Sequence, residues 1–321
     1  MRTTVSIPIR AVLWMFFLVT ILATGCQAAA DDESKQAAPA ETAQLQNKPK
    51  LTFGIIYPMA HPYYETITQN AKEAAQHYGI NLIVKAPDEA NLEQQIRMME
   101  TMIAQKVNGI AISPIDSNVM TPIINKAVQA GITVFCFESD APGSQRMSYI
   151  GADNVATGKG IGKIVDQLLN GSGMIIVENG ISITMSAKER LKGMLDYLEQ
   201  NTSIQVLEVL HHEGSNTLAL QQLEKMIDDH PHFDAFIALD YVASSTSILV
   251  WKATGLSRYA LAVGMMPETK EAIRNGQITA SLSQNEQKWG SLIIEGLYQA
   301  AGNRAVSSAQ DSGLTEIRAV P

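Results

Sequence analysis

From residue 51 to residue 137, short apolar segments alternate with longer segments of helical periodicity. The apolar segments span 51–57, 80–84, 109–112 and 132–137, and the helical ones span 63–78, 92–106 and 119–130. Strands that are apolar throughout are buried on both faces, which is typical of a parallel sheet covered by helices. Gly79 and Gly131 lie where two helices are expected to end. This alternation predicts a doubly wound α/β unit.

A second set of the same kind follows along the chain. Its predicted strands are 174–177, 204–210, 235–239, 261–263, 279–282 and 314–318, and its predicted helices are 158–169, 186–200, 218–229, 244–254, 269–274 and 288–301. The predicted fold class is therefore α/β, with two doubly wound, Rossmann-like parallel-sheet lobes. Ligands of open α/β sheets bind outside the carboxyl ends of the strands, so two facing lobes create one ligand cleft between them.

The first 26 residues predict export. Arg2 and Arg10 precede an apolar run at 11–21 that is too short to span a bilayer, and Gly25 stands just before Cys26. A cysteine directly after a small residue is the pattern of bacterial lipoproteins, so residues 1–25 are predicted to be a lipoprotein signal peptide and Cys26 the lipidated residue. The alternative is an ordinary exported protein. Residues 27–49 have no aromatic side chain and few large aliphatic ones, which predicts a flexible tether over 26–49.

The acidic charge of the chain disfavours anionic partners. There are 24 Lys and Arg against 32 Asp and Glu, and loss of Arg2 and Arg10 with the signal peptide makes the balance still more acidic. Nucleic acids and anionic membrane faces need a basic footprint, so neither is expected as a partner. Cys136 lies in an apolar run and is expected to be a buried hydrophobe; with Cys26 lipidated, no intramolecular disulfide is available.

Polar and aromatic side chains follow the predicted strands at their carboxyl ends. They are His61, Tyr63, Tyr64, Ser113, Asp116, Glu138, Ser139, Glu178, Asn179, His211, Asp240, Tyr241 and Gln284. Arg190 lies on the helix that follows Asn179, and the apolar Met265 and Met266 end a further strand. Aromatic rings, carboxylates, an arginine and amides together suit a small polyol or sugar, because carboxylates accept and guanidinium groups donate paired hydrogen bonds. For His61 and Asp116 the competing interpretation is a helix cap, and for Arg190 it is a solvated helix face.

At these residues the chain resembles the periplasmic-type sugar-binding proteins of the ribose-binding cluster, which have the type I substrate-binding fold. The resemblance runs from residue 51 to the end. It is carried by His61-Pro62-Tyr63-Tyr64, Gly151-Ala152-Asp153-Asn154, the segment 186–193, the strand ending at Asp240, Asn275-Gly276-Gln277 and Gln284.

The resemblance implies roles for individual residues. Tyr63 and Tyr64 would pack on a sugar ring, His61 would contact the ligand, and Glu138, Arg190, Asp240 and Gln284 would supply polar contacts. Three departures distinguish this chain: Ser139 stands where an arginine is frequent, Met266 where an aspartate is usual, and no stacking aromatic is evident near 212–215. The pocket is therefore expected to take a bulkier, less hydroxylated or differently charged ligand than ribose.

The resemblance also implies a domain plan. The first lobe is expected to comprise 50–152 with 285–311, and the second 153–284 with 312–321, joined by a three-segment hinge. A ligand that contacts both lobes closes them, and a membrane partner, the permease of an ABC importer, then binds the closed form. The protein is expected to be a monomer that is held outside the cytoplasm by its lipid anchor, with no metal and no cofactor.

Three other classes were weighed. A sensor kinase or chemoreceptor could receive the closed form in place of a permease, and nothing in the sequence separates the two. A sugar-responsive repressor needs a DNA-binding helix-turn-helix where this chain has an export signal. An enzyme needs a Ser/His/Asp arrangement, a metal-ligand spacing or a phosphate-binding glycine loop, and none is found. His211 and His212 are adjacent on a strand and point to opposite faces, which disfavours a shared metal.

Overall fold

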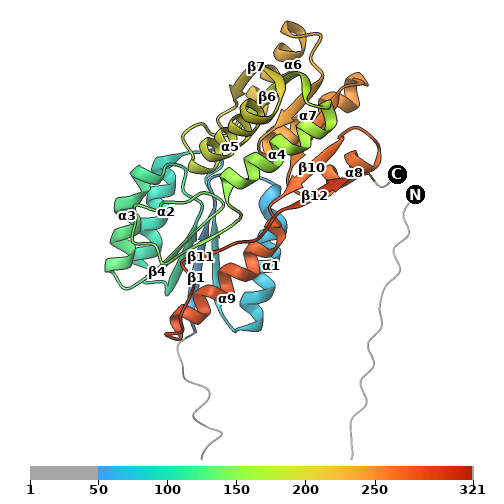
Figure 1. Cartoon of the computed structure of the whole chain (residues 1–321). Helices are drawn as coiled ribbons and strands as arrows, with labels where there is room; N and C mark the ends of the chain where they lie inside the picture. Colours follow the sequence, from blue (N-terminus) through green and yellow to red (C-terminus); the bar gives the residue numbers. More distant parts are fainter. Residues whose placement is uncertain (1–49, 320–321) are drawn as a thin grey trace, which may run out of the picture. The chain divides into compact units, whose positions relative to one another are not determined.

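The computed structural model describes residues 50–319. The predicted signal peptide at 1–25, the lipidation site Cys26 and the tether at 26–49 lie outside the described residues. Within 50–319, strands and helices alternate in two α/β lobes, as predicted (Figure 1). Among these residues no helix combines the length and the apolar character needed to cross a bilayer.

The first lobe is built on a parallel sheet with the strand order β11-β5-β4-β3-β1-β2. Its strands are β1 (Thr52–Ile56), β2 (Asn81–Lys85), β3 (Gly109–Ile112), β4 (Thr133–Phe137), β5 (Ser148–Ile150) and β11 (Ala309–Gln310). One face is covered by α1 (Tyr63–His77) and α9 (Trp289–Ala301), the other by α2 (Leu92–Ala104) and α3 (Ser117–Gln129) (Figure 1). Ile55 packs with the first helix pair and its neighbour Ile56 with the second, which is why these strands are apolar at every position.

The second lobe has the order β12-β10-β9-β8-β6-β7, parallel except for β12. Its strands are β6 (Ser172–Asn179), β7 (Ser203–His211), β8 (Ala235–Ala238), β9 (Tyr259–Val263), β10 (Ala280–Ser283) and β12 (Thr315–Arg318). The helices α4 (Asn154–Leu169) and α5 (Met185–Asn201) pack on one face, and α6 (Asn216–Asp229), α7 (Tyr241–Thr254) and α8 (Pro267–Arg274) on the other.

The chain passes between the two sheets three times, in line with the predicted three-segment hinge. The passages run from β5 to α4, from β10 through the short 3-10 helix η1 (Glu286–Lys288) to α9, and from β11 to β12. The lobe boundaries at residues 152, 284 and 311 remain a proposal; the membership of the strands in the two sheets is compatible with them.

Several local predictions are confirmed. Asp116 caps α3, since its carboxylate accepts hydrogen bonds from the N–H groups of Asn118 and Val119. Gly79 and Gly131 follow α1 and α3 with positive φ, which glycine adopts without a steric penalty. The strands β5 and β11 were not predicted, because segments of three and two residues are too short to show a periodicity.

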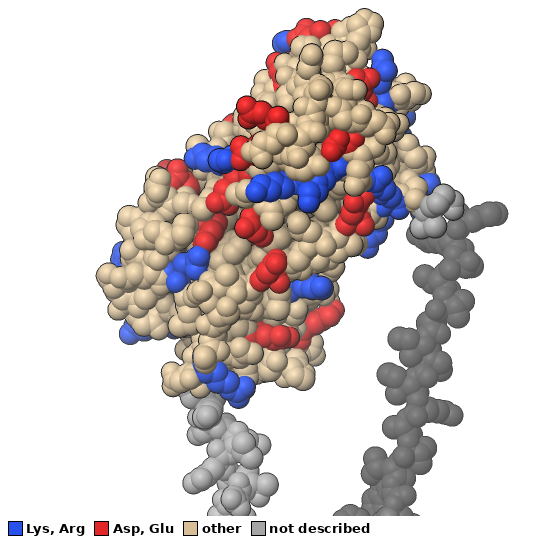
Figure 2. Space-filling view, viewed as in Figure 1, with Lys and Arg blue, Asp and Glu red and all other residues tan. Residues whose placement is uncertain are grey.

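Burial and charge also agree with the sequence. Cys136 is fully buried, and burial raises the pKa of its thiol, so it is a packed hydrophobe and not a reactive group. On the face shown in Figure 2, basic and acidic side chains are interspersed.

Candidate functional site

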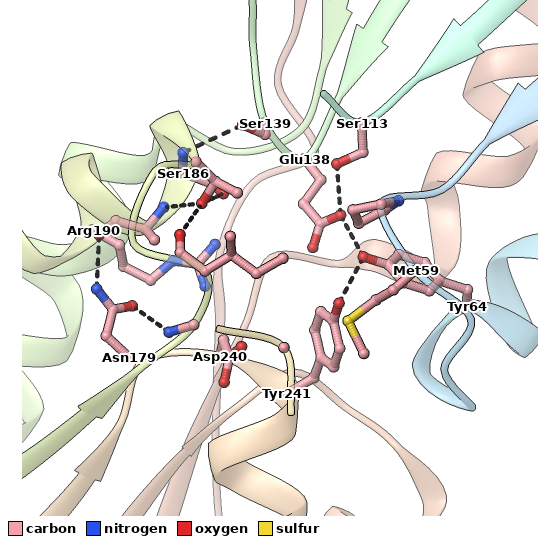
Figure 3. Close-up of a pocket in the computed structure, with 16 residues that line it drawn as sticks. Met59, Tyr64, Ser113, Glu138, Ser139, Asn179, Ser186, Arg190, Asp240 and Tyr241 are labelled. Carbon is pink, nitrogen blue, oxygen red and sulfur yellow. Dashed lines mark hydrogen bonds between the residues drawn. The ribbon is translucent and has the colours of Figure 1, made fainter. Parts of the chain in front are cut away.

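A cavity lies between the lobes, at the carboxyl ends of strands from both sheets (Figure 3). It is lined by Pro58, Met59, Tyr64, Ser113, Glu138 and Ser139 from the first lobe and by Asn179, Gly180, Ile181, Thr184, Ser186, Ala187, Arg190, Gly214, Asp240 and Tyr241 from the second. About 40 Å³ of it is open to the centres of water-sized spheres. A single water needs roughly 10–15 Å³ measured in this way, so the space suits a few waters or one compact small molecule.

Glu138 is the carboxylate at the centre of the first-lobe wall. It follows β4 directly and has a positive φ of 61°, a conformation that costs a non-glycine residue about 1–3 kcal/mol and that tends to be kept at functional sites. Its Oε2 accepts hydrogen bonds from Tyr64 Oη at 2.8 Å and Ser113 Oγ at 3.0 Å. Burial raises the pKa of Glu138 to about 7, although these two hydrogen bonds and the nearby Arg190 act in the opposite direction. The carboxylate is therefore poised between its two protonation states at neutral pH.

Arg190 supplies the positive charge of the site from α5. The guanidinium donates to the carbonyl of Leu239 at 2.5 Å and to Asn154 Oδ1 at 2.9 Å. Arg190 is only 5% exposed, and its Nε has no hydrogen-bond partner within residues 50–319. A buried donor without a partner is costly, so an acceptor supplied by a ligand would stabilise it. The interpretation of Arg190 as a solvated helix face is wrong, because the side chain is buried between the sheet and α4.

Asp240 carries the second carboxylate, at the start of α7. It caps this helix by accepting from the N–H of Ala243 at 2.9 Å, and its Oδ1 lies 3.0 Å from His212 Nε2. Burial alone would raise the pKa of Asp240, but the charge of His212 and the hydrogen bond from its ring lower it overall. The pKa of His212 rises in turn, because Asp240 outweighs the effect of burial. Asp240 is therefore the ionised carboxylate of the cavity.

Tyrosine rings join the two lobes at the cavity wall. Tyr64 stacks on Tyr57 with ring centroids 4.3 Å apart, both in the first lobe. Tyr241, from α7 in the second lobe, stacks on Tyr63 at 4.4 Å, and its hydroxyl lies 3.0 Å from that of Tyr64 (Figure 3). The hydrophobic core of the first lobe thus includes side chains of the second, namely Ala219, Tyr241, Val242 and Met266, and the lobes are in contact in this structure.

Of the predicted site residues, five lie together on the cavity lining: Tyr64, Glu138, Ser139, Arg190 and Asp240. The hydroxyl of Ser139 accepts a hydrogen bond of 3.5 Å from the N–H of Ser186, across the cleft.

The other four lie next to the cavity and do not line it. His61 accepts from the N–H of Tyr63 through Nδ1 at 3.1 Å and faces a neighbouring hollow; the N-cap of α1 is Pro62 and not His61. Tyr63 and Met266 line a further hollow beside the hinge. Gln284 donates to Asn154 Oδ1 at 3.0 Å, so it positions the amide to which Arg190 donates. Whether any of the nine binds a ligand stays a prediction.

Sequence reasoning did not commit to several lining residues. Ser113, Asn179 and Tyr241 were recognisable as strand-end side chains, but nothing in the sequence ranked them above their neighbours. Gly180, Ile181 and Gly214 have no polar side chain and therefore gave no chemical signal. Asn154 links the lobes, because its amide donates to the carbonyl of Glu138 at 3.0 Å while its Oδ1 accepts from Arg190.

Glu178 and Asn179 were both predicted to follow a strand at the cleft, and the structure separates them at the end of β6. Asn179 lines the cavity, whereas Glu178 points to the other face of the sheet, since neighbouring strand residues alternate. Glu178 is fully buried, and neither of its oxygens has a hydrogen-bond partner within the described part of the chain. Across 50–319, no group of three or more His, Cys, Asp and Glu side chains is arranged to hold a metal ion.

Comparisons with known proteins agree with this geometry. The D-ribose/D-allose-binding protein of Pseudomonas aeruginosa is 22% identical over 264 residues, which cover 75% of this chain and 79% of the relative. An ABC transporter solute-binding protein from Burkholderia graminis, solved in complex with D-arabinose, superposes with a TM-score of 0.81 at 24% identity and covers 85% of this chain and 96% of its own. XylFII, solved in a complex with LytSN, gives a TM-score of 0.79 at 20% identity, covering 84% and 98% of the two chains.

The model of the periplasmic binding protein domain matches residues 54–305, which is most of the chain and includes all the residues that line the cavity. With its two α/β lobes and the cavity between them, this chain belongs to the periplasmic binding protein domain family.

Proposed function

We propose that this protein is an extracytoplasmic solute-binding lipoprotein that captures a sugar or sugar-like molecule between its lobes and delivers it to an ABC importer. The observation that carries the proposal is the cavity itself, which receives Glu138 from one lobe and Arg190 and Asp240 from the other. A ligand in this cavity contacts both lobes. Only such a ligand can shift the balance between open and closed forms, because the shift equals the difference in its affinity for the two.

The chemistry of the lining supports a polyhydroxylated ligand. The Oε1 atom of Glu138 accepts no hydrogen bond from the described residues, and Arg190 Nε donates none, so an acceptor and a donor remain for a ligand. A sugar hydroxyl can donate to the first and accept from the second. Tyr64 and Tyr241 add aromatic faces and hydroxyls of the kind that pack against sugar C–H groups.

Membrane attachment and the partner rest on the sequence and on the relatives. The solved relative from Burkholderia graminis carries the name of a solute-binding protein of an ABC transporter, which supports an importer and not an enzyme. Export and lipidation at Cys26 are part of the proposal, and so is a monomeric state in solution. Replacement of Cys26 by serine is expected to release the protein from membranes, which cell fractionation and metabolic labelling with a fatty-acid analogue would detect.

The first test is thermal unfolding of the protein against a panel of pentoses, hexoses, deoxysugars, inositols and amino sugars. A ligand at a hundredfold excess over its Kd stabilises the folded state by about 2.7 kcal/mol, which shifts the Tm of a protein of this size by about 5 °C or more. A shift with one compound, abolished by Arg190→Ala and kept by Lys192→Ala on the same helix, supports the proposal. Lys192 is a suitable control because its side chain is exposed. No shift with any member of the panel would exclude a sugar ligand.

A second function is favoured by one observation. The fold relative XylFII was solved in a complex with another protein, LytSN. The closed form of this chain could in the same way be presented to a sensor kinase or chemoreceptor. Deletion of the candidate permease gene distinguishes the two: loss of ligand uptake supports import, whereas intact uptake with a lost transcriptional response supports sensing.

A further inference from the structure

Asp240 is held in the cavity wall by a histidine that does not itself line the cavity. His212 follows β7 directly, is fully buried and lies outside the lining. Its ring lies between two partners: Nδ1 accepts from the N–H of Gly214 at 3.0 Å, and Nε2 lies 3.0 Å from Asp240 Oδ1. Gly214 and Asp240 both line the cavity. His212 is therefore placed to act on the cavity through these two residues and not by contact with a ligand.

The hydrogen bond from Gly214 determines which ring nitrogen of His212 carries the proton. A backbone N–H can only donate, so Nδ1 has a free lone pair, and a neutral imidazole then has its one proton on Nε2. This Nε2–H donates to Asp240 Oδ1. Burial lowers the pKa of His212, and Asp240, Glu178 and Glu213 raise it overall. A second proton would nevertheless enter at Nδ1 and face the N–H of Gly214, so the geometry favours the neutral Nε2–H tautomer.

The two oxygens of the Asp240 carboxylate consequently have different surroundings. Oδ1 accepts from His212 and, at 2.9 Å, from the N–H of Ala243 in the first turn of α7. Oδ2 accepts no hydrogen bond from residues 50–319, and 15% of the side-chain surface is exposed. Oδ2 lies against Gly180, where a Cβ atom would come within 2.6 Å of it. The carboxylate is thus anchored through Oδ1, while Oδ2 has room beside a glycine of the cavity lining (Figure 3).

The second donor on Oδ1 restricts the rotation of the carboxylate. The terminal torsion of an aspartate side chain is broad, so a single donor from Ala243 would leave the direction of Oδ2 poorly defined. With His212 as a further donor, the direction of Oδ2 is set before a ligand arrives. A group that is already ordered loses less conformational entropy on binding, which increases affinity without a new contact to the ligand.

We propose that His212 is a positioning residue for ligand binding: together with the N–H of Ala243 it holds Asp240 Oδ1, so that Oδ2 is oriented to accept from a hydroxyl of the bound sugar. The inference rests on the proposed sugar-binding function and adds to it a residue outside the cavity lining. Hydrogen bonds to charged groups are stronger than those between neutral groups, so removal of this donor is expected to weaken binding by roughly tenfold or more.

The tautomer of His212 can be measured without a ligand. In protein labelled with nitrogen-15 at histidine, long-range proton–nitrogen correlation spectra at pH 8 distinguish the two ring nitrogens, and the His212 signals are assigned by their loss in His212→Gln. A proton on Nε2 and a free lone pair on Nδ1 are expected. A ring protonated at Nδ1 alone, or at both nitrogens, overturns the inference.

Two amide variants separate positioning of Asp240 from a merely structural role. His212→Gln can place an amide donor near the former position of Nε2, whereas the shorter side chain of His212→Asn can accept from Gly214 but does not reach Asp240. If His212 positions Asp240, the Kd measured by titration calorimetry rises about tenfold in His212→Asn and stays within about threefold of the parent value in His212→Gln. If His212 only anchors the loop at Gly214, the order is reversed. The reversed order, or equal Kd values in the two variants, overturns the proposal.

His230→Asn is the matched control. His230 pairs with Glu208 at 3.1 Å in the same lobe, and neither residue lines the cavity, so the Kd of this variant is expected to equal that of the parent. An equal loss of affinity in His230→Asn and His212→Asn would contradict the proposal.

The probes are the pentoses, hexoses, deoxysugars, inositols and amino sugars of the thermal panel, each first titrated into the parent protein. Binding of one of them to the parent, with the wrong order of Kd values in the two His212 variants, overturns this inference and leaves the sugar-binding function intact. Failure of every probe to bind the parent rejects the sugar-binding function itself, and with it the role of His212.

Discussion

Glu178 allows a quantitative test of the structure through the pH dependence of stability. Its side chain is 0% exposed, and its two oxygens have no hydrogen-bond partner within residues 50–319. Burial raises the pKa of Glu178 from 4.5 to about 8; the charge of His212 lowers it and that of Asp240 raises it. The folded state therefore holds a proton on this residue at neutral pH, whereas the unfolded chain has released it.

The raised pKa fixes the sign of the effect. A group that binds its proton more tightly in the folded state stabilises the fold fully below pH 4.5, and this contribution is lost as the pH rises through about 8. Each unit of pKa difference corresponds to about 1.4 kcal/mol, so the folded protein is expected to lose roughly 3.5 kcal/mol between pH 5 and pH 8 through this group alone. The side chain of Glu178→Gln is neutral over this whole pH range, so the variant does not lose this stability.

The assay is urea unfolding of the parent protein and of Glu178→Gln at pH 5, 6, 7 and 8, followed by tryptophan fluorescence, to which Trp251 of the same lobe contributes together with the other tryptophans of the chain. The free energy of unfolding of the variant, relative to the parent, is expected to increase by about 3.5 kcal/mol from pH 5 to pH 8. Glu199→Gln, an exposed residue on α5, is the control and is expected to show no such increase. A difference that stays constant over the pH range would refute the account of Glu178 as a buried, protonated carboxyl group.

Three further outcomes follow from the cavity. Ligand affinity is expected to increase about threefold or more from pH 6 to pH 8, because hydroxyls that donate to Glu138 favour its ionised form and its pKa in the unliganded protein is about 7. Glu138→Gln should remove this pH dependence of the affinity in calorimetry. An identical pH profile in the variant would exclude Glu138 as its source. Tyr64→Phe keeps the stacking on Tyr57 and loses the hydrogen bond to Glu138. Calorimetry should therefore show roughly tenfold weaker ligand binding, with little change in Tm. An unaltered ligand affinity would contradict a role for the Tyr64 hydroxyl in binding. Tyr241→Ala removes the ring that joins the lobes, so the radius of gyration of the unliganded protein should increase in small-angle X-ray scattering. The radius of gyration of Tyr241→Phe should equal that of the parent protein. No increase in Tyr241→Ala would mean that other contacts hold the lobes together.

Much of the fold follows from local sequence. Fully apolar strands between amphipathic helices require burial on both faces, and the two hydrophobic clusters on opposite sides of β1 show that burial directly. Helix ends at Gly79 and Gly131 and the cap at Asp116 depend only on neighbouring residues, so they too could be predicted. The edge strands β5 and β11 could not, since their identity as strands depends on the partner strand and not on their own few residues.

The candidate site, like the fold, could be predicted only in part from the sequence. Side chains at the carboxyl ends of parallel strands converge because of topology, so Glu138, Ser139 and Asp240 could be placed at one cleft from the sequence. Which of them remain free for a ligand depends on contacts between distant segments. Gln284 was expected in the site, but it donates to Asn154, which is 130 positions away and is itself an acceptor for Arg190. His61 similarly uses its ring to accept from the helix that it precedes.

By itself, then, the sequence determined the two-lobed α/β architecture and the set of strand-end residues from which a site can be built, and it predicted a signal for export. These follow from periodicity, composition and short-range capping, each of which acts over a few residues. Only the tertiary structure decided the pairing of Tyr64 with Tyr241 and the burial of Glu178 without a hydrogen-bond partner among residues 50–319. Each of these depends on the distance between groups far apart in the chain, and that distance is set when the lobes pack and come together.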